Sequence, residues 1–126
     1  MFGKKKDAES ELLARITTSA AKTWDISEFE VRFFIQLEKE IKAAGLLISD
    51  FSTVRMGNGG IRINHYSGII GTVHLRKKFG SLQYFIDALN NHDMQDAPLE
   101  ACIATIPYLI DYTKLCIKTH KKALSV

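Results

Sequence analysis

The sequence predicts an α+β fold in a single domain, with the element order ααβββαα. Apolar residues recur at helical spacing before residue 45 and after residue 96, whereas residues 53–76 alternate between apolar and polar. Six of the eight glycines lie between residues 51 and 86, as expected for tight turns between strands. The chain of 126 residues, 46% apolar and 25% charged, is long enough for one hydrophobic core. We expect residues 1–6 to form a disordered basic tail and residues 7–126 to form the domain.

The first predicted helix covers residues 7–22, with Leu12, Leu13, Ile16 and Ala20 along one face. The second helix begins after Ser27, because Ser27 and Glu30 have the spacing of a capping box. It runs to about Ala44, where Gly45 provides a helix end. Its apolar stripe repeats at three- and four-residue steps and consists of Ile26, Phe29, Phe33, Leu37 and Ile41.

The centre of the chain predicts a three-stranded antiparallel meander. Asn58-Gly59 favours a two-residue type I′ turn, which pairs Arg55 with Arg62 and Val54 with Ile63. For the turn near Ser67-Gly68, a two-residue loop would mix polar and apolar partners. A three-residue loop instead sets Arg62 opposite His74, and we prefer it. The predicted core face carries Val54, Met56, Ile61, Ile63, Val73 and Leu75. The predicted polar face carries Thr53, Arg55, Arg62, Asn64, Thr72, His74 and Arg76.

The C-terminal third predicts a short helix, a polar loop and a long helix. Ser81 caps a helix that extends to about Asn90, and residues 90–95 form the loop. Asp96 caps the last helix, in which Pro107 predicts a kink. The buried stripe of this helix consists of Leu99, Ile103, Ile106, Ile110, Thr113 and Ile117.

Residues 51–86 carry five Lys and Arg residues but no Asp or Glu, while the flanking segments are nearly balanced in charge. In the predicted register this positive charge gathers on the polar sheet face, where guanidinium groups suit phosphate. The predicted anion-binding residues are Arg55, Arg62, His74, Arg76, Lys77 and Lys78. The predicted base-stacking residues are Tyr66, Phe79 and Tyr84. An alternative is that a carboxylate from a nearby helix pairs with these arginines.

The sequence contains no motif that predicts a catalytic, metal or cofactor site. The four histidines are dispersed, and Cys116 with His120 on one helix face make only half of a zinc site. The segment Gly57–Gly60 is followed by a strand rather than a helix, which is typical of a turn and not of a phosphate loop. Cys102 and Cys116 would lie about 21 Å apart on a continuous helix, too far for a disulfide.

The sequence therefore predicts a small, non-catalytic, cytoplasmic binding protein that engages an anionic partner, either nucleic acid, which we favour, or an acidic protein. No apolar run reaches the length of about 18 residues needed to cross a membrane. The alternative function is a protein–protein interaction or regulatory module, including a homodimer formed through a second face of the last helix at Cys102, Leu109 and Tyr112. A third reading is a small enzyme that gathers His65 or His74 with a carboxylate in a pocket.

Overall fold

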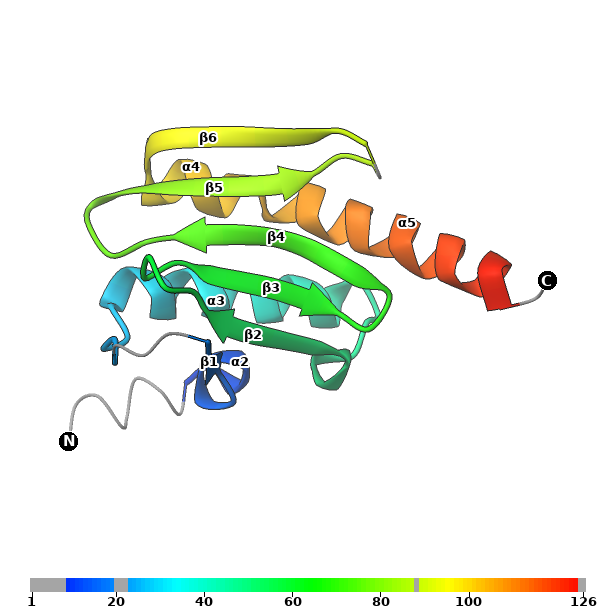
Figure 1. The fold of residues 1–126 in the computed structure, drawn as a ribbon, viewed down its shortest axis with the longest axis horizontal. Coiled ribbons are helices and arrows are strands. Elements are labelled where there is room, and N and C mark those ends of the chain that lie inside the picture. The colour runs from blue at the N-terminus through cyan, green and yellow to red at the C-terminus, as the bar shows by residue number, and fades with distance from the viewer. Residues whose placement is uncertain (1–8, 20–22, 88, 125–126) are drawn as a thin grey trace.

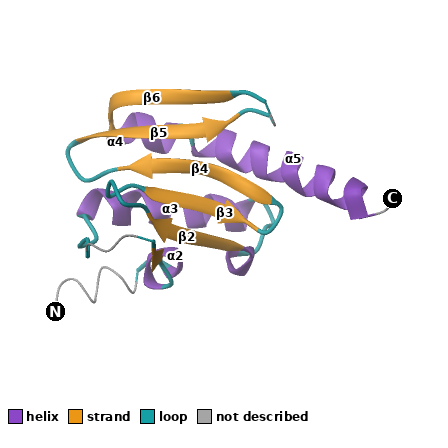
Figure 2. Cartoon of the chain, viewed as in Figure 1, coloured by secondary structure: helices purple, strands orange, loops and turns teal. Residues whose placement is uncertain are grey.

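The computed structural model describes residues 9–19, 23–87 and 89–124. Within this part of the chain, six strands form one sheet with helices packed against it (Figures 1 and 2). The helical elements are α2 (Glu11–Ala14), α3 (Glu28–Ala43), the short 3₁₀ helix η1 (Ile48–Asp50), α4 (Leu99–Ala104) and α5 (Ile106–Leu124). The strands are β1 (Thr17–Thr18), β2 (Phe51–Arg55), β3 (Ile61–His65), β4 (Gly68–His74), β5 (Phe79–Phe85) and β6 (Asn91–Pro98).

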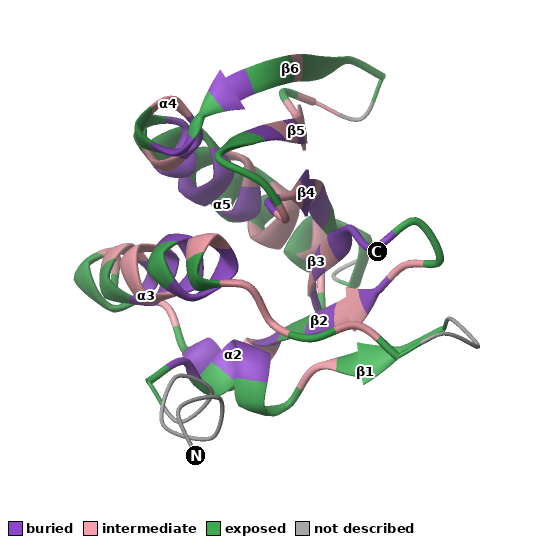
Figure 3. Cartoon of the chain, turned by 90° about the vertical axis from the view of Figure 1, so that its left-hand side faces the viewer, coloured by how far each residue is buried: buried purple, intermediate pink, exposed green. Residues whose placement is uncertain are grey.

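The strands lie in sequence order across the sheet, with β1 parallel to β2 and every other neighbouring pair antiparallel. Helices α3, α4 and α5 lie on one side of the sheet, which we call its inner face (Figure 3). No helix of the described residues covers the opposite, outer face. The predicted α+β class is confirmed, but the predicted element order and the three-stranded meander are wrong, because the sheet has six strands.

The N-terminal helix is much shorter than the predicted residues 7–22. Helix α2 covers a single turn, capped by the Ser10 side chain, which accepts from the Leu13 N–H. After α2 the chain forms the two-residue strand β1, which pairs with β2 at the edge of the sheet. The β-branched Thr17 and Thr18 favour strand over helix. The remainder of the predicted helix, and the predicted tail of residues 1–6, lie outside the described residues.

Helix α3 agrees with the sequence prediction at both ends. The capping box is present, with the Ser27 Oγ accepting from the Glu30 N–H and the Glu30 carboxylate accepting from the Ser27 N–H. At the other end Gly45 takes a φ of 77°, and Gly45 and Leu46 donate back to the carbonyls of the last turn. This Schellman pattern needs a left-handed residue, which glycine adopts without strain.

The β2–β3 hairpin differs from the prediction by one residue. Val54 pairs with Arg62 and Arg55 with Ile61, so the connection is the wider loop of residues 56–60 rather than a two-residue turn. The Met56 N–H donates to the Gly60 carbonyl, and Gly59 takes a φ of 92°. A one-residue shift exchanges the two faces of a strand. Arg55 therefore points to the inner face, and the predicted core position of Val54 is wrong.

Over Ile61–Ile63 the pairing of β3 with β4 differs from the prediction by two residues, so the faces are retained there. The predicted three-residue loop is wrong. His65 pairs with Gly68 across a two-residue turn at Tyr66 and Ser67, and an irregularity follows between Ile63 and Asn64. Arg62 lies opposite Thr72, not opposite His74 as predicted. The sorting of β3 and β4 into polar and apolar faces is nevertheless correct, because only an odd shift reverses it.

Strands β5 and β6 replace the predicted helix 81–90 and the predicted loop 90–95, and both predictions are wrong. Gly80 allows β5 to approach β4 closely, since a Cβ there would collide with the Leu75 side chain. Strand β6 is an edge strand whose side chains are mostly polar, a composition that edges tolerate because one side faces water. Asp96, predicted to cap the last helix, instead lies within β6 at a φ of 50°.

The last helix is divided where Pro107 predicts a kink. α4 ends at Ala104, and the Thr105 hydroxyl donates to the Cys102 carbonyl before α5 begins at Ile106. Cys102 and Leu109 are buried in the core, so these two residues do not form the second helix face predicted for a homodimer. Both cysteines are free thiols.

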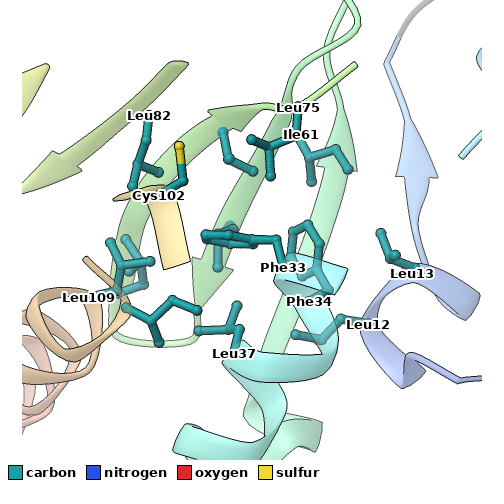
Figure 4. Close-up of a cluster of buried hydrophobic side chains, with 14 of the residues drawn as sticks. Leu12, Leu13, Phe33, Phe34, Leu37, Ile61, Leu75, Leu82, Cys102 and Leu109 are labelled. Atoms are coloured by element: carbon teal, nitrogen blue, oxygen red, sulfur yellow. The ribbon is translucent and has the colours of Figure 1, made fainter. Parts of the chain in front are cut away.

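The core lies between the inner face of the sheet and the helices. In Figure 4, Phe33, Phe34 and Leu37 of α3 stand between Leu12 and Leu13 of α2 on one side and Cys102 and Leu109 on the other. The side chains of Ile61, Leu75 and Leu82 close the cluster from the sheet. In the described part of the chain, no helix has both the length and the apolar composition needed to span a bilayer.

Candidate functional site

Arg55, the first of the predicted anion-binding residues, is buried in an ion pair. Its guanidinium donates to both carboxylate oxygens of Glu30 on α3, at 2.5 and 3.2 Å, and to the Gly59 carbonyl at 2.8 Å. Arg55 is 3% exposed and Glu30 is fully buried. The prediction that Arg55 lies on the open sheet face is therefore wrong, because the β2 register turns the residue inward. This is the alternative arrangement, in which a helix carboxylate pairs with the arginine.

Arg76 lies close to the same Glu30 carboxylate. Its guanidinium lies 3.5 Å from Glu30, donates to the Asp25 carbonyl at 2.6 Å and stands over the Trp24 ring at 5.0 Å. Its side chain is 21% exposed. Glu30 thus neutralises much of the charge of two predicted site residues while also capping α3, and neither arginine is presented as a free cation.

The remaining predicted cations are spread along the outer face and one of its ends. Arg62 and His74 lie on the outer face, and the His74 Nε2 donates to the Asn58 carbonyl at 2.8 Å. Lys77 and Lys78 are exposed in the β4–β5 connection. A polar hollow of about 370 Å³ on this face is lined by Asn58, Thr72, His74, Ser81, Leu82, Gln83, Asp93 and Gln95. The structure therefore adds a carboxylate, Asp93, to the region that the sequence predicts to be free of acids.

The three predicted stacking residues do not form one platform. Tyr66 lies in the β3–β4 turn, with its ring 5.4 Å from that of His120. Phe79 lies beyond the opposite end of β4, where it is 52% exposed. Tyr84 lies on the inner face and stacks on Tyr108 of α5 at 5.9 Å. Neighbouring bases of one nucleic-acid strand could not stack on all three rings together.

A hollow lies between α5 and the end of β5. Its volume is about 510 Å³. Tyr84 stacks on Tyr108, and the Phe85 ring lies 5.8 Å from that of Tyr112. Tyr108 is 57% exposed and Ile86 55% exposed, so large apolar surfaces meet water here. The hollow is lined by Tyr84, Phe85, Ile86, Tyr108, Asp111, Tyr112 and Leu115.

A second hollow of about 240 Å³ continues along the same helix. It shares Tyr112 and Leu115 with the first hollow, so the two form one groove beside α5. The second hollow is lined by Ser67, Gly68, Tyr112, Leu115, Cys116, Thr119, His120 and Ala123. From Tyr108 to Ala123 the groove follows about 22 Å of helix. We call these two linked hollows the α5 groove; Figure 1 shows α5 continuing past the sheet toward the C-terminus.

Burial shifts the pKa of Tyr112 in the α5 groove and of His65 near its end toward the neutral form of each side chain. Burial, the hydrogen bond with Cys116 and the charges of Cys116 and Asp87 raise the pKa of Tyr112 to about 12. At the end of the groove, burial lowers the pKa of His65, against a weaker raising effect of Asp50. The His65 Nδ1 accepts from the Ser67 N–H at 3.2 Å and lies 2.6 Å from the Ser67 Oγ, so this histidine closes the β3–β4 turn.

The third reading requires a pocket that gathers His65 or His74 with a carboxylate, and the hollow on the outer face is lined by both His74 and Asp93. Among the described residues, no carboxylate is hydrogen-bonded to His65 or His74. No group of three or more metal-ligating side chains is found in that part of the chain. Burial also raises the pKa of the Cys102 thiol, which disfavours the reactive thiolate.

The α5 groove was not predicted as a site, and one signal in the sequence could have found it. Tyr108, Tyr112 and Leu115 follow helical spacing on a stripe distinct from the buried one. Only Tyr112 of this stripe was among the residues predicted for a second face. Comparison with known proteins adds no further guide, since no family model, no curated protein and no solved structure matches this chain.

Proposed function

We propose that this protein is a non-catalytic protein-interaction domain whose α5 groove binds an apolar helix of a protein partner. The observation that carries the proposal is the continuous aromatic groove beside α5, with Tyr108, Ile86 and Leu115 exposed along it. Contiguous exposed apolar surface is typical of interaction sites, whereas single exposed apolar residues are common on any protein surface.

The shape of the groove favours a helix over a loop or a flat surface. A groove of about 22 Å matches roughly four turns of helix, the usual length for an amphipathic helix that docks in a groove. Aromatic residues at the centre of such a contact contribute much of the binding free energy, since they bury large areas with little loss of conformational entropy. Tyr108 and Tyr112 are the anchors that we expect to matter most.

Nucleic-acid binding through the outer face is the weaker proposal. Glu30 pairs with Arg55 and draws in Arg76, while Asp93 adds negative charge to the outer face. Phosphate binding depends on the number of cations presented together. Arg62 remains on β3, apart from Lys77 and Lys78, which lie together in the β4–β5 connection. The free thiols of Cys102 and Cys116 support a cytoplasmic location as part of the same proposal.

Site-specific photo-cross-linking in cells of the source organism tests the proposed function. A benzophenone amino acid is placed at Tyr108 in the groove and, as the matched control, at Gln83 on the outer face. We expect a discrete protein adduct from position 108, with the cross-linked peptide mapping to an apolar helix, and none from position 83. The adduct should disappear when Leu115 is also changed to Glu. Absence of a protein adduct at 108, or equal adducts at both positions, would contradict the proposal.

A further inference from the structure

We infer that the helix bound in the α5 groove is α5 of a second copy of this chain, packed antiparallel. The inference rests on the proposed function, because it names the occupant of the same groove. Two independent features of the α5 sequence carry it: the distribution of side-chain sizes along the groove and the distribution of charge beside it.

Side-chain size changes from one end of the groove to the other. Along the exposed stripe of α5, the bulky Tyr108 and Tyr112 come first and the small Thr119 and Ala123 come last, with Leu115 between them. The bulky His120 also lines the last part of the groove, but its ring packs against Tyr66 of its own chain. An antiparallel copy centred near Leu115 sets Tyr108 against Ala123 and Tyr112 against Thr119. Large residues then meet small ones along the contact, which gives even packing. A parallel copy would set tyrosine against tyrosine and leave space between the small residues.

Charge beside the groove changes in the same direction. Asp111 and Lys118 are seven residues apart, which places them on the same flank of α5 about two turns from each other. Both are exposed, and among the described residues neither makes an ion pair within its own chain. In an antiparallel pair, Asp111 of each copy lies opposite Lys118 of the other. In a parallel pair, like charges would lie opposite each other and repel.

The antiparallel arrangement also satisfies the symmetry of a closed dimer. A twofold axis near Leu115 makes the same surface serve both copies, so each favourable pair occurs twice and the assembly stops at two. The extension of α5 past the sheet leaves the C-terminal half of the stripe accessible to a partner (Figure 1). The exposed Leu115, at 43%, would become the centre of the contact.

Sedimentation of the purified full-length chain tests the inference through a charge-reversal cycle. We expect a dimer for the wild type, a monomer for Leu115→Glu, and an unchanged dimer for the outer-face control Gln83→Glu. Asp111→Lys and Lys118→Asp should each weaken the dimer about tenfold, because a reversed charge repels its partner at two symmetric sites. Combining the two substitutions should return the dissociation constant to near the wild-type value. A monomeric wild type, or a double variant weaker than either single variant, would overturn the antiparallel dimer.

Disulfide cross-linking separates the two helix directions. In a Cys116→Ser background, Leu115→Cys should form a disulfide-linked dimer, because position 115 lies near the twofold axis. Tyr108→Cys should not, because antiparallel packing holds the two copies of position 108 about 22 Å apart. Rapid cross-linking at 108 would show a parallel pair and refute the inference. If the purified chain is monomeric while the Tyr108 photo-probe captures a helix of a different protein, this inference fails and the proposed function stands. If the probe captures nothing, both fail.

Discussion

The sequence favours the outer face of the sheet as the binding site, whereas the structure favours the α5 groove. The sequence predicts a binding site on the outer face because residues 51–86 carry positive charge without acids. In the fold, one buried carboxylate from a distant helix pairs with Arg55 and also contacts Arg76. The sequence did not predict the groove, because its residues come from separate segments and Tyr84 and Tyr112 were predicted for other roles. In the fold these residues line the groove together, and Tyr108 remains more than half exposed. The comparison shows that one tertiary contact with a carboxylate can neutralise basic residues that the sequence suggests are free. Apolar residues that the core does not cover remain exposed in the folded chain.

The largest expected effect is on the stability of the fold and concerns Glu30, the buried carboxylate that pairs with Arg55. Glu30→Gln leaves Arg55 buried without a counter-charge, and removing one partner of a buried ion pair costs about 3–5 kcal/mol. We expect urea denaturation of Glu30→Gln to show a free energy of unfolding that is lower than that of the wild type by this amount. The control is Glu28→Gln, an exposed residue in the same first turn of α3, which should change stability by less than about 0.5 kcal/mol. A loss as small as that of the control would contradict the stabilising role of the ion pair and would favour Arg55 again as an anion-binding residue.

The second prediction compares two leucines of α5 and so sharpens the distinction between core and groove. Leu109 is 1% exposed and Leu115 is 43% exposed. Leu109→Ala should lower the free energy of unfolding by about 2–4 kcal/mol through a cavity, measured on the monomeric Leu115→Glu background. Leu115→Ala in the otherwise wild-type chain should weaken self-association while far-ultraviolet circular dichroism stays unchanged. If both substitutions destabilise the monomer equally, the groove belongs to the core and is not a binding surface.

The smallest expected effect is on binding of nucleic acid to the outer face. We expect single-stranded DNA to bind only in the non-specific range of about 10⁻⁴–10⁻⁶ M at physiological salt. A combined Arg62→Glu and Lys77→Glu variant should reduce the salt slope slightly, and Leu115→Glu should leave DNA binding unchanged. The measurement is fluorescence anisotropy at several salt concentrations. Tight, sequence-dependent binding that Arg62→Glu abolishes would reverse the ranking of the two surfaces.

The parts of the fold that depend on neighbouring residues were predictable. Ser27 and Glu30 define the start of α3, and Gly45 its end, because each acts through hydrogen bonds to residues within one turn. Pro107 marks the division of the last helix for the same reason. By contrast, Leu82, Phe85, Ile86 and Leu89 have helical spacing, and yet residues 79–85 form β5. Pairing with β4 and β6 outweighed this local pattern.

By itself, the sequence determined the α+β class, the limits of α3, the presence of two hairpins and the faces of β3 and β4. Each follows from local hydrogen bonding or from residue alternation. Only the tertiary structure decided the register of β2, and with it the side of the sheet to which Arg55 points. A shift of one residue there reverses every side chain, and the choice depends on Glu30, which is 25 residues away in sequence. The tertiary structure also decided the α5 groove, because only the packed helices and sheet show which apolar residues the core leaves uncovered.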